Sequence, residues 1–257
     1  MPPPPGAPPP PPPPDGLGPP PGYVAYGSAP TPTQRVHRIG GLSKAITVLV
    51  AIAGLGGIVN AFVQLSVTGD AEDFLAGRIS SDEFNDRILS TSAFSIISGL
   101  ATLASAIVVM IWMYRIAANL RAYGIPTTWH PLFAIFGWFL PPGVLYVIPL
   151  LMLREQWSKS KPSTVAPTGE SSSSENPFLW VWWVCFGLLP LLTLALSANS
   201  TFSGFGDTSA EAVAENFVDT STTALLVGAA SGIVSAVTWI LFSRQLTERH
   251  RALTGER

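Results

Sequence analysis

The stretch Tyr114–Trp157, YRIAANLRAYGIPTTWHPLFAIFGWFLPPGVLYVIPLLMLREQW, decides how this chain is organised. It begins where one long apolar run ends, and it contains a second apolar run that is interrupted by Pro141 and Pro142. Two consecutive prolines break a helix, because neither has an amide hydrogen to donate and the second pushes the first out of the α region. The stretch therefore predicts two helical halves, 132–140 and 143–153, in place of one continuous helix.

The length of these halves leaves three interpretations of the broken run 131–153. As helices, the halves would be about 13 and 16 Å long. Each would reach roughly halfway through a hydrocarbon core of about 30 Å. The run then forms a re-entrant helical hairpin, a kinked crossing helix or a segment lying in the interface. Irregular backbone at half depth survives only when it is buried in protein or lines a wet cavity.

The sequence around this stretch is that of an integral membrane protein. Charged residues make up only 12% of the chain, about half of what soluble proteins carry. Four uncharged runs are long enough to cross a bilayer as helices, and they cover residues 45–67, 88–114, 178–198 and 221–243. We predict an all-α membrane protein with four transmembrane helices, arranged as two hairpins with the proline-broken helix between them.

The distribution of charge favours the re-entrant hairpin and orients the chain. If the broken run does not cross, 12 of the 14 basic residues lie on one side, and only Arg78 and Arg87 lie on the other with ten of the sixteen carboxylates. If it crosses, the basic residues split five against nine. Basic residues collect on the cytoplasmic side of membrane proteins. We therefore expect both termini in the cytoplasm of a cell whose plasma membrane the chain spans.

Outside the spans, composition divides the chain further. Residues 1–34 hold 16 of the 25 prolines, which predicts a disordered cytoplasmic tail with polyproline II character. Residues 35–157 contain the first hairpin and the broken run, 158–176 form a Ser- and Pro-rich flexible linker, and 177–257 contain the second hairpin and a basic C-terminus.

Small residues recur at helical spacing on two of the spans. On the first span they are Ala53, Gly57 and Ala61, and on the last they are Gly228, Gly232 and Ala236. Stripes of this kind let transmembrane helices approach closely. We expect both stripes to form helix–helix contacts.

Polar side chains within the spans are expected to face protein, because burying them in lipid is costly. Asn60 and Gln64 lie one turn apart on the first span, and Ser95 lies in the Ser- and Thr-rich start of the second. They are candidates for interhelical hydrogen bonds. If the broken run carries a site, they are also candidates for a ligand or ion path near the amides that follow Pro142.

The candidate functional region is the rim and the tip of the broken run. Its members are Arg115, Asn119, Arg121, Trp138, Pro141, Pro142, Gly143, Pro149, Arg154, Glu155 and Trp157. The charged members also have a plainer interpretation as interfacial anchors and as charges that complement helix C-termini.

The spacing of the histidine, cysteine, aspartate and glutamate residues predicts no metal site and no catalytic site. His37, His130 and His250 are far apart and are expected to be interfacial or solvated. The single cysteine, Cys185, has no intramolecular disulfide partner, and no metal-ligand spacing is present. Every Asp and Glu lies outside the spans, and we find no nucleophile–base arrangement. We therefore expect no enzyme activity, no cofactor and no metal.

The opening stretch resembles a bacterial membrane family known only as domain of unknown function 4328. The resemblance is carried by Tyr114-Arg115, Asn119-Leu120, Gly124, Trp129, Pro131, Gly137-Trp138-Phe139, the spacing from Pro142 to Pro149, and Arg154-Glu155-x-Trp157. The family also commonly has proline-rich cytoplasmic tails. Between its two spaced prolines it carries an asparagine and a basic residue, whereas residues 144–148 of this chain are uncharged. The resemblance implies no known activity.

The function that fits these expectations best is a membrane scaffold or interaction module. Its partners would be the bilayer itself, anionic lipids at the basic face, a protein that binds the proline-rich tail, and a second copy of the chain. We expect no nucleic-acid partner. The alternative is a small oligomeric transporter or channel-like protein, since transporters build their sites at broken helices.

Overall fold

The computed structural model describes residues 35–139, 146–161, 175–190 and 209–256, and every regular element within these ranges is helical. The predicted all-α class is therefore confirmed. The proline-rich tail, most of the linker and the tip Pro141-Pro142-Gly143 lie outside the described residues.

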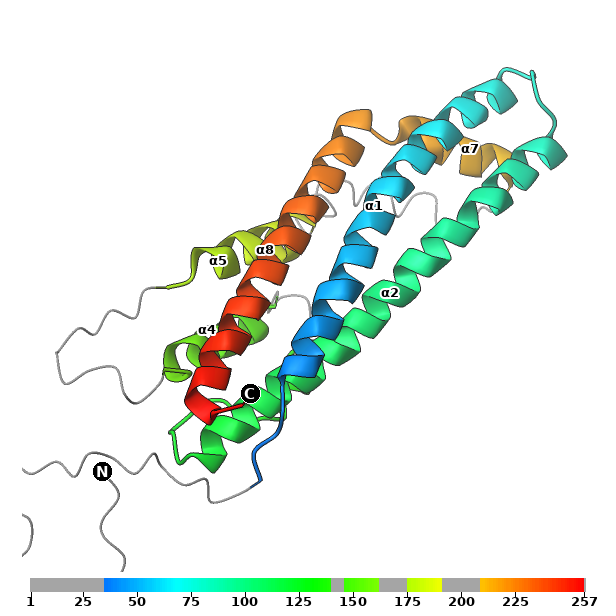
Figure 1. Ribbon diagram of the computed structural model, residues 1–257. Coiled ribbons are helices and arrows are strands. Elements are labelled where there is room, and N and C mark those ends of the chain that lie inside the picture. The colour runs from blue at the N-terminus through cyan, green and yellow to red at the C-terminus, as the bar shows by residue number, and fades with distance from the viewer. Residues whose placement is uncertain (1–34, 140–145, 162–174, 191–208, 257) are drawn as a thin grey trace, which may run out of the picture. The chain divides into compact units, whose positions relative to one another are not determined.

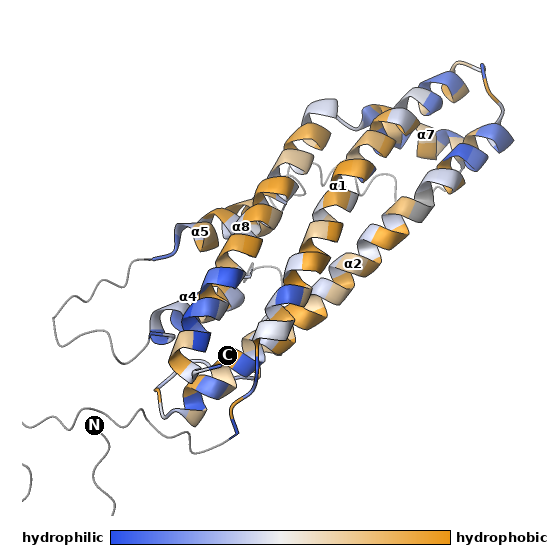
Figure 2. Ribbon diagram, in the orientation of Figure 1, coloured by the Kyte–Doolittle hydropathy of each residue, from blue (hydrophilic) through white to orange (hydrophobic). Residues whose placement is uncertain are grey.

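Three helices, α1 (Gly40–Leu75), α2 (Ser81–Ala122) and α8 (Thr222–Thr254), are long and apolar enough to cross a membrane. Each is longer than the apolar run that predicted it. At the start of α2, for example, the hydroxyl oxygen of Ser80 accepts the amide hydrogen of Glu83 at 3.2 Å and caps the helix before the apolar run begins. Figure 2 shows apolar residues along the middle of α1 and α2, and hydrophilic residues toward their ends.

Helix α1 packs against both α2 and α8 (Figure 1). The short helix α7 (Ala210–Asp219) packs mainly against α1. The predicted fourth span, 178–198, begins as α5 (Pro177–Trp183) and continues as a π-helical turn, η2 (Val184–Leu188), and both pack against α8. From residue 191 onward, this span lies outside the described residues.

The broken run folds into two short helices whose boundaries differ from the prediction. Helix α3 covers only Phe133–Phe136, and α4 covers Val147–Lys159. Tyr146 precedes α4 with φ of 56°, a left-handed conformation that an α-helix cannot continue through, so α4 starts later than residue 143. Pro149 lies in the first turn of α4, where its missing amide hydrogen removes no helical bond.

The two ends of the broken run meet. The carboxylate of Glu155 accepts the amide hydrogens of Thr128, at 2.6 Å, and Trp129, at 3.3 Å. A single crossing helix would separate these residues by about 30 Å. The run between them therefore turns back to the end of the bundle at which it began.

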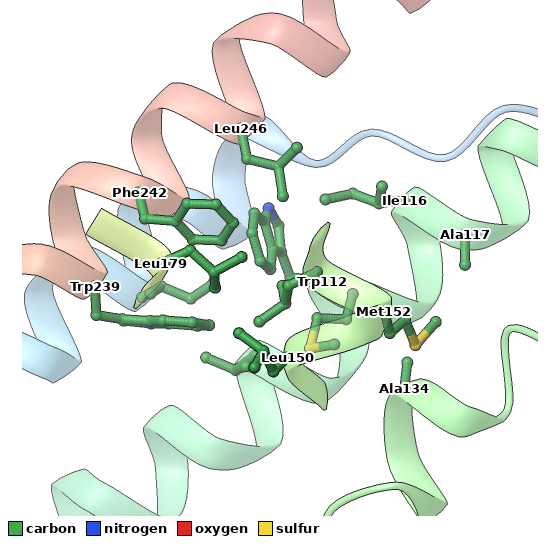
Figure 3. Packing of buried hydrophobic residues seen from close by; sticks show 14 of the residues in the cluster. Trp112, Ile116, Ala117, Ala134, Leu150, Met152, Leu179, Trp239, Phe242 and Leu246 are labelled. Carbon is green, nitrogen blue, oxygen red and sulfur yellow. The ribbon is translucent and has the colours of Figure 1, made fainter. Parts of the chain in front are cut away.

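Most of the buried apolar side chains gather at this end of the bundle, which we call the basic end because Arg115 and Arg121 of α2 and Arg249 of α8 lie there. Trp112 of α2 lies among Phe242 and Leu246 of α8 and Met152 of α4 (Figure 3), and its indole nitrogen donates to the hydroxyl of Thr247 at 3.0 Å. A second, smaller cluster contains Ala71, Phe84 and Ala214, which belong to α1, α2 and α7. We call this end of the bundle the acidic end, because carboxylates such as Asp70, Glu83 and Glu211 neighbour the cluster in the sequence.

Candidate functional site

A half-open cavity of about 750 Å³, here called the chamber, lies between α1, α2, α8, η2 and the broken run. Its volume is within the range of small-molecule sites in proteins. No described residue that lines it is charged. The chamber is therefore suited to an apolar, uncharged molecule.

The two stripes of small residues form walls of this chamber. Ala53, Gly57 and Ala61 line it from α1, and Gly228, Gly232 and Ala236 line it from α8. A Cβ atom placed on Gly57, Gly228 or Gly232 would meet no atom within 4 Å. The prediction that the stripes form helix–helix contacts is therefore wrong for these three glycines.

Other glycines bring the helices together. A Cβ on Gly54 would lie 3.1 Å from the Cβ of Ala236, and one on Gly56 would lie 2.7 Å from the hydroxyl oxygen of Ser98. Gly54 therefore sets the approach of α1 to α8, and Gly56 sets its approach to α2. On α1, the close contacts are displaced by one residue from the predicted stripe, and Gly57 faces open space. On α8, the stripe residue Ala236 makes the predicted contact with α1, whereas Gly228 and Gly232 face open space.

Aromatic side chains from both sides of the break lie at one end of the chamber. The ring centroid of Trp138 lies 5.7 Å from that of Tyr146 and 6.3 Å from that of Trp182. Trp182 lies 4.5 Å from Trp239 of α8. All four residues line the chamber, so the broken run contributes directly to its wall.

Two of the three intramembrane polar candidates line the chamber, and the third forms a hydrogen bond with one of them. The hydroxyl of Ser95 donates to Oδ1 of Asn60 at 2.8 Å and joins α2 to α1. Asn60 and Gln64 both line the chamber. These side chains give an otherwise apolar wall a few fixed polar groups.

At the basic end, the side-chain amide of Asn119 is the centre of a buried network. Its Oδ1 accepts the amide hydrogen of His37 at 2.7 Å, and its Nδ2 donates to the carbonyl oxygen of His37 at 2.8 Å. The same Nδ2 lies 3.2 Å from Nε2 of His250, whose Nδ1 lies 2.9 Å from the hydroxyl of Ser160. Asn119, His250 and Ser160 are completely buried. The network links the segment before α1 to α2, to the end of α4 and to α8.

The prediction that His250 is interfacial or solvated is wrong. Because Nδ2 of Asn119 can only donate, neutral His250 accepts at Nε2 and carries its hydrogen on Nδ1. Burial lowers the pKa of His250 to about 4, while the nearby carboxylate of Glu256 acts in the opposite direction. His250 lies beyond the apolar run 221–243, and sequence spacing gives no indication that it would meet Asn119.

Further contacts fasten the start of α1 to this end. The carboxylate of Glu256 accepts the amide hydrogens of Ile39 and Gly40, each at 3.0 Å, and so caps a helix that has no local side-chain cap. Arg115 donates to the carbonyl oxygen of Arg38 at 2.9 Å. Arg115 and Asn119, two of the predicted residues, thus hold the same short segment.

The remaining members of the candidate region hold the broken run in place. Arg154 pairs with Glu175, and Arg121 donates to the hydroxyl of Thr127 at 3.3 Å. Trp157 lies 6.0 Å from Phe242, and the guanidinium of Arg249 lies 4.5 Å from the centre of the Trp157 ring. Pro149 is buried. The candidate residues therefore divide between two places: Trp138 lines the chamber, and the others that are described lie at the basic end.

Within the described ranges, no group of three His, Cys, Asp or Glu side chains is placed to hold a metal ion.

Comparison with known families agrees with the resemblance of the opening stretch. A family model described as Domain of unknown function (DUF4328) matches residues 77–248, which is most of the chain and includes α2 through most of α8. No curated protein and no solved structure matches the chain. Helix α1, with Asn60 and Gln64, precedes the matched residues. The chain therefore belongs to the family of proteins with this domain of unknown function.

Proposed function

We propose that the chain is a four-span protein of the plasma membrane that holds an apolar, uncharged ligand within the bilayer. In this topology, both termini and the broken run face the cytoplasm. Three helices of sufficient length, the segregation of basic residues and the turned-back run support it. Large apolar side chains such as Leu55, Phe62 and Leu100 are more than half exposed, which suits contact with lipid.

The chamber is the observation that carries the proposed binding function. A protein that used its small residues only to pack helices would leave no such volume, because transmembrane interfaces bring small residues into contact. Here Gly57, Gly228 and Gly232 face the space instead. Without charged groups on its described wall, the chamber favours an apolar molecule over an ion.

Filling the chamber should weaken binding. The probe is diphenylhexatriene, an apolar fluorophore, and the signal is saturable energy transfer from the tryptophans to the probe with the full chain in nanodiscs. Because a leucine side chain at position 232 would occupy space that the probe needs, we expect Gly232→Leu to raise the half-saturating mole fraction of the probe at least about tenfold, equivalent to about 1.4 kcal/mol of binding free energy.

Gly99→Leu is the matched control, because Gly99 also has no atom within 4 Å of its ideal Cβ position but does not line the chamber. This variant should bind as the unmodified chain does. Equal binding by the chain and by Gly232→Leu, or no saturable component in either, would contradict the proposal.

A scaffold role is the second candidate, and the fastened start of α1 favours it. Asn119 and Glu256 fix residues 37–40, so a segment that follows the proline-rich tail has a defined place in the bundle. Such an anchor suits a tail that recruits a protein partner. An unchanged set of co-purified proteins after deletion of residues 1–34 would argue against this role.

In the transporter alternative, a solute would occupy the same chamber while it crosses the membrane. It is favoured by the aromatic groups that both sides of the break contribute to the wall, from Trp138 and Tyr146. With four spans, such a function needs more than one copy of the chain.

A further inference from the structure

A second, half-open cavity of about 240 Å³ adjoins the chamber toward the acidic end of the bundle, and Asn216 and Thr220 are exposed at its edge. It lies between α1, α7 and the start of α8. Gln64 and Leu225 line both cavities. These two side chains therefore lie at the boundary between the chamber and the second cavity.

The second cavity differs from the chamber in chemistry, because four of its seven described lining residues carry polar side chains. They are Gln64, Thr68, Asn216 and Thr220. The hydroxyl of Thr68 donates to the carbonyl oxygen of Gln64 at 3.0 Å, and that of Thr220 donates to the carbonyl oxygen of Asn216 at 2.7 Å. The hydroxyl hydrogens are thus committed to the backbone.

The side-chain amides of Gln64 and Asn216 are not committed in this way. Neither forms a hydrogen bond with another side chain or backbone group in the part of the chain that the structure describes. Each amide offers one oxygen acceptor and two N–H donors. Two such groups, one on α1 and one on α7, are suited to bind hydroxyl, carbonyl or amide groups.

Charge around the second cavity argues against an anionic ligand. None of its described lining residues is charged. At this end, Arg78 pairs with Asp73, and Arg87 pairs with Asp70 and Glu83, so both arginines are engaged by carboxylates. Helix α7 adds Glu211, Glu215 and Asp219 without a basic residue. An anion would therefore be repelled.

We propose that the second cavity binds the uncharged polar head of an amphipathic molecule whose hydrocarbon part fills the chamber. Gln64 and Asn216 bind the head, and Leu225 contacts the molecule where head and hydrocarbon join. This assignment rests on the proposed function, because it requires the chamber to hold the hydrocarbon. A monoacylglycerol has this chemistry, with a diol head and one acyl chain.

The test is displacement of diphenylhexatriene by monoolein, added to the nanodisc lipid over a range of mole fractions. We expect Gln64→Met and Asn216→Leu, which keep the side-chain size and remove the amide, each to raise the half-displacing mole fraction about fivefold, as loss of one or two neutral hydrogen bonds predicts. Binding of diphenylhexatriene itself should not change in Asn216→Leu, because Asn216 does not line the chamber. Asn85→Leu, at an exposed asparagine of the same end, should behave as the unmodified chain.

Oleate, which has the same chain with a carboxylate head, should displace the probe at least about tenfold less well than monoolein. Equal displacement by monoolein in the chain and in both amide variants, with normal probe binding, would overturn the head-group assignment alone. Displacement by oleate as strong as by monoolein would also overturn it. Absence of saturable probe binding would instead overturn the proposed function.

Discussion

Replacing Asn119 with alanine should lower the free energy of unfolding by about 3 kcal/mol. The side chain is completely buried, and it pairs with both backbone groups of His37 and with the ring of His250. Removing it leaves buried donors and acceptors without partners, which costs more than the loss of the bonds alone. In a chain of this size, the midpoint of thermal unfolding should fall by about 6–12 °C.

Thermal unfolding of the purified chain in nanodiscs measures this effect. Asn85→Ala is the matched control, because Asn85 also lies on α2 but is exposed, and it should shift the midpoint by little. Equal midpoints for Asn119→Ala and Asn85→Ala would show that the network does not stabilise the fold.

Acidification should destabilise the chain through His250. In the folded state, burial holds the pKa of His250 at about 4, against 6.5 for an unperturbed histidine. Between these values, the unfolded chain binds a proton that the folded chain does not, so stability is fully present above pH 6.5 and falls as the pH decreases toward 4. Protonation would also place a hydrogen on Nε2, where Asn119 already donates.

The free energy of unfolding is expected to fall by about 2 kcal/mol between pH 7.5 and pH 5. This fall is measured as the difference in unfolding free energy at the two values. His250→Gln should flatten the dependence over this range, whereas His130→Gln, which replaces an exposed histidine, should leave it unchanged. A dependence that is the same in all three proteins would exclude His250 as its source.

The sequence predicted that the run 131–153 is interrupted, and the structure has the separate helices α3 and α4 there, but the sequence did not predict where these helices begin and end. The charged end Arg154-Glu155 and the pair Arg115 and Asn119 were predicted because they follow the ends of apolar runs. Their partners were not predictable, because Glu155 binds the amides of residues 128 and 129, and Asn119 binds the backbone of residue 37. Those contacts depend on how the helices come together.

The wall of the chamber contains a pattern that was identified correctly but interpreted wrongly. The stripe of small residues on α1 is present, but Gly57 within it does not contact another helix. The stripe on α1 identifies a face without bulky side chains, but it does not determine whether another helix or an open space lies against that face. The neighbouring glycines Gly54 and Gly56 make the close approaches, and this small rotation of α1 turns the stripe toward the chamber.

We propose that the broken run enters the membrane from the cytoplasmic side and returns to that side, at the basic end of the bundle. The most direct measurement is labelling of single cysteines with a membrane-impermeant maleimide on intact cells, in a chain that carries Cys185→Ala. Ser81→Cys and Ser209→Cys should react from outside, because both lie on the predicted external side. Ser158→Cys should react only after the cells are permeabilised. Labelling of Ser158→Cys together with Ser81→Cys on intact cells would contradict the account and require the broken run to cross the membrane.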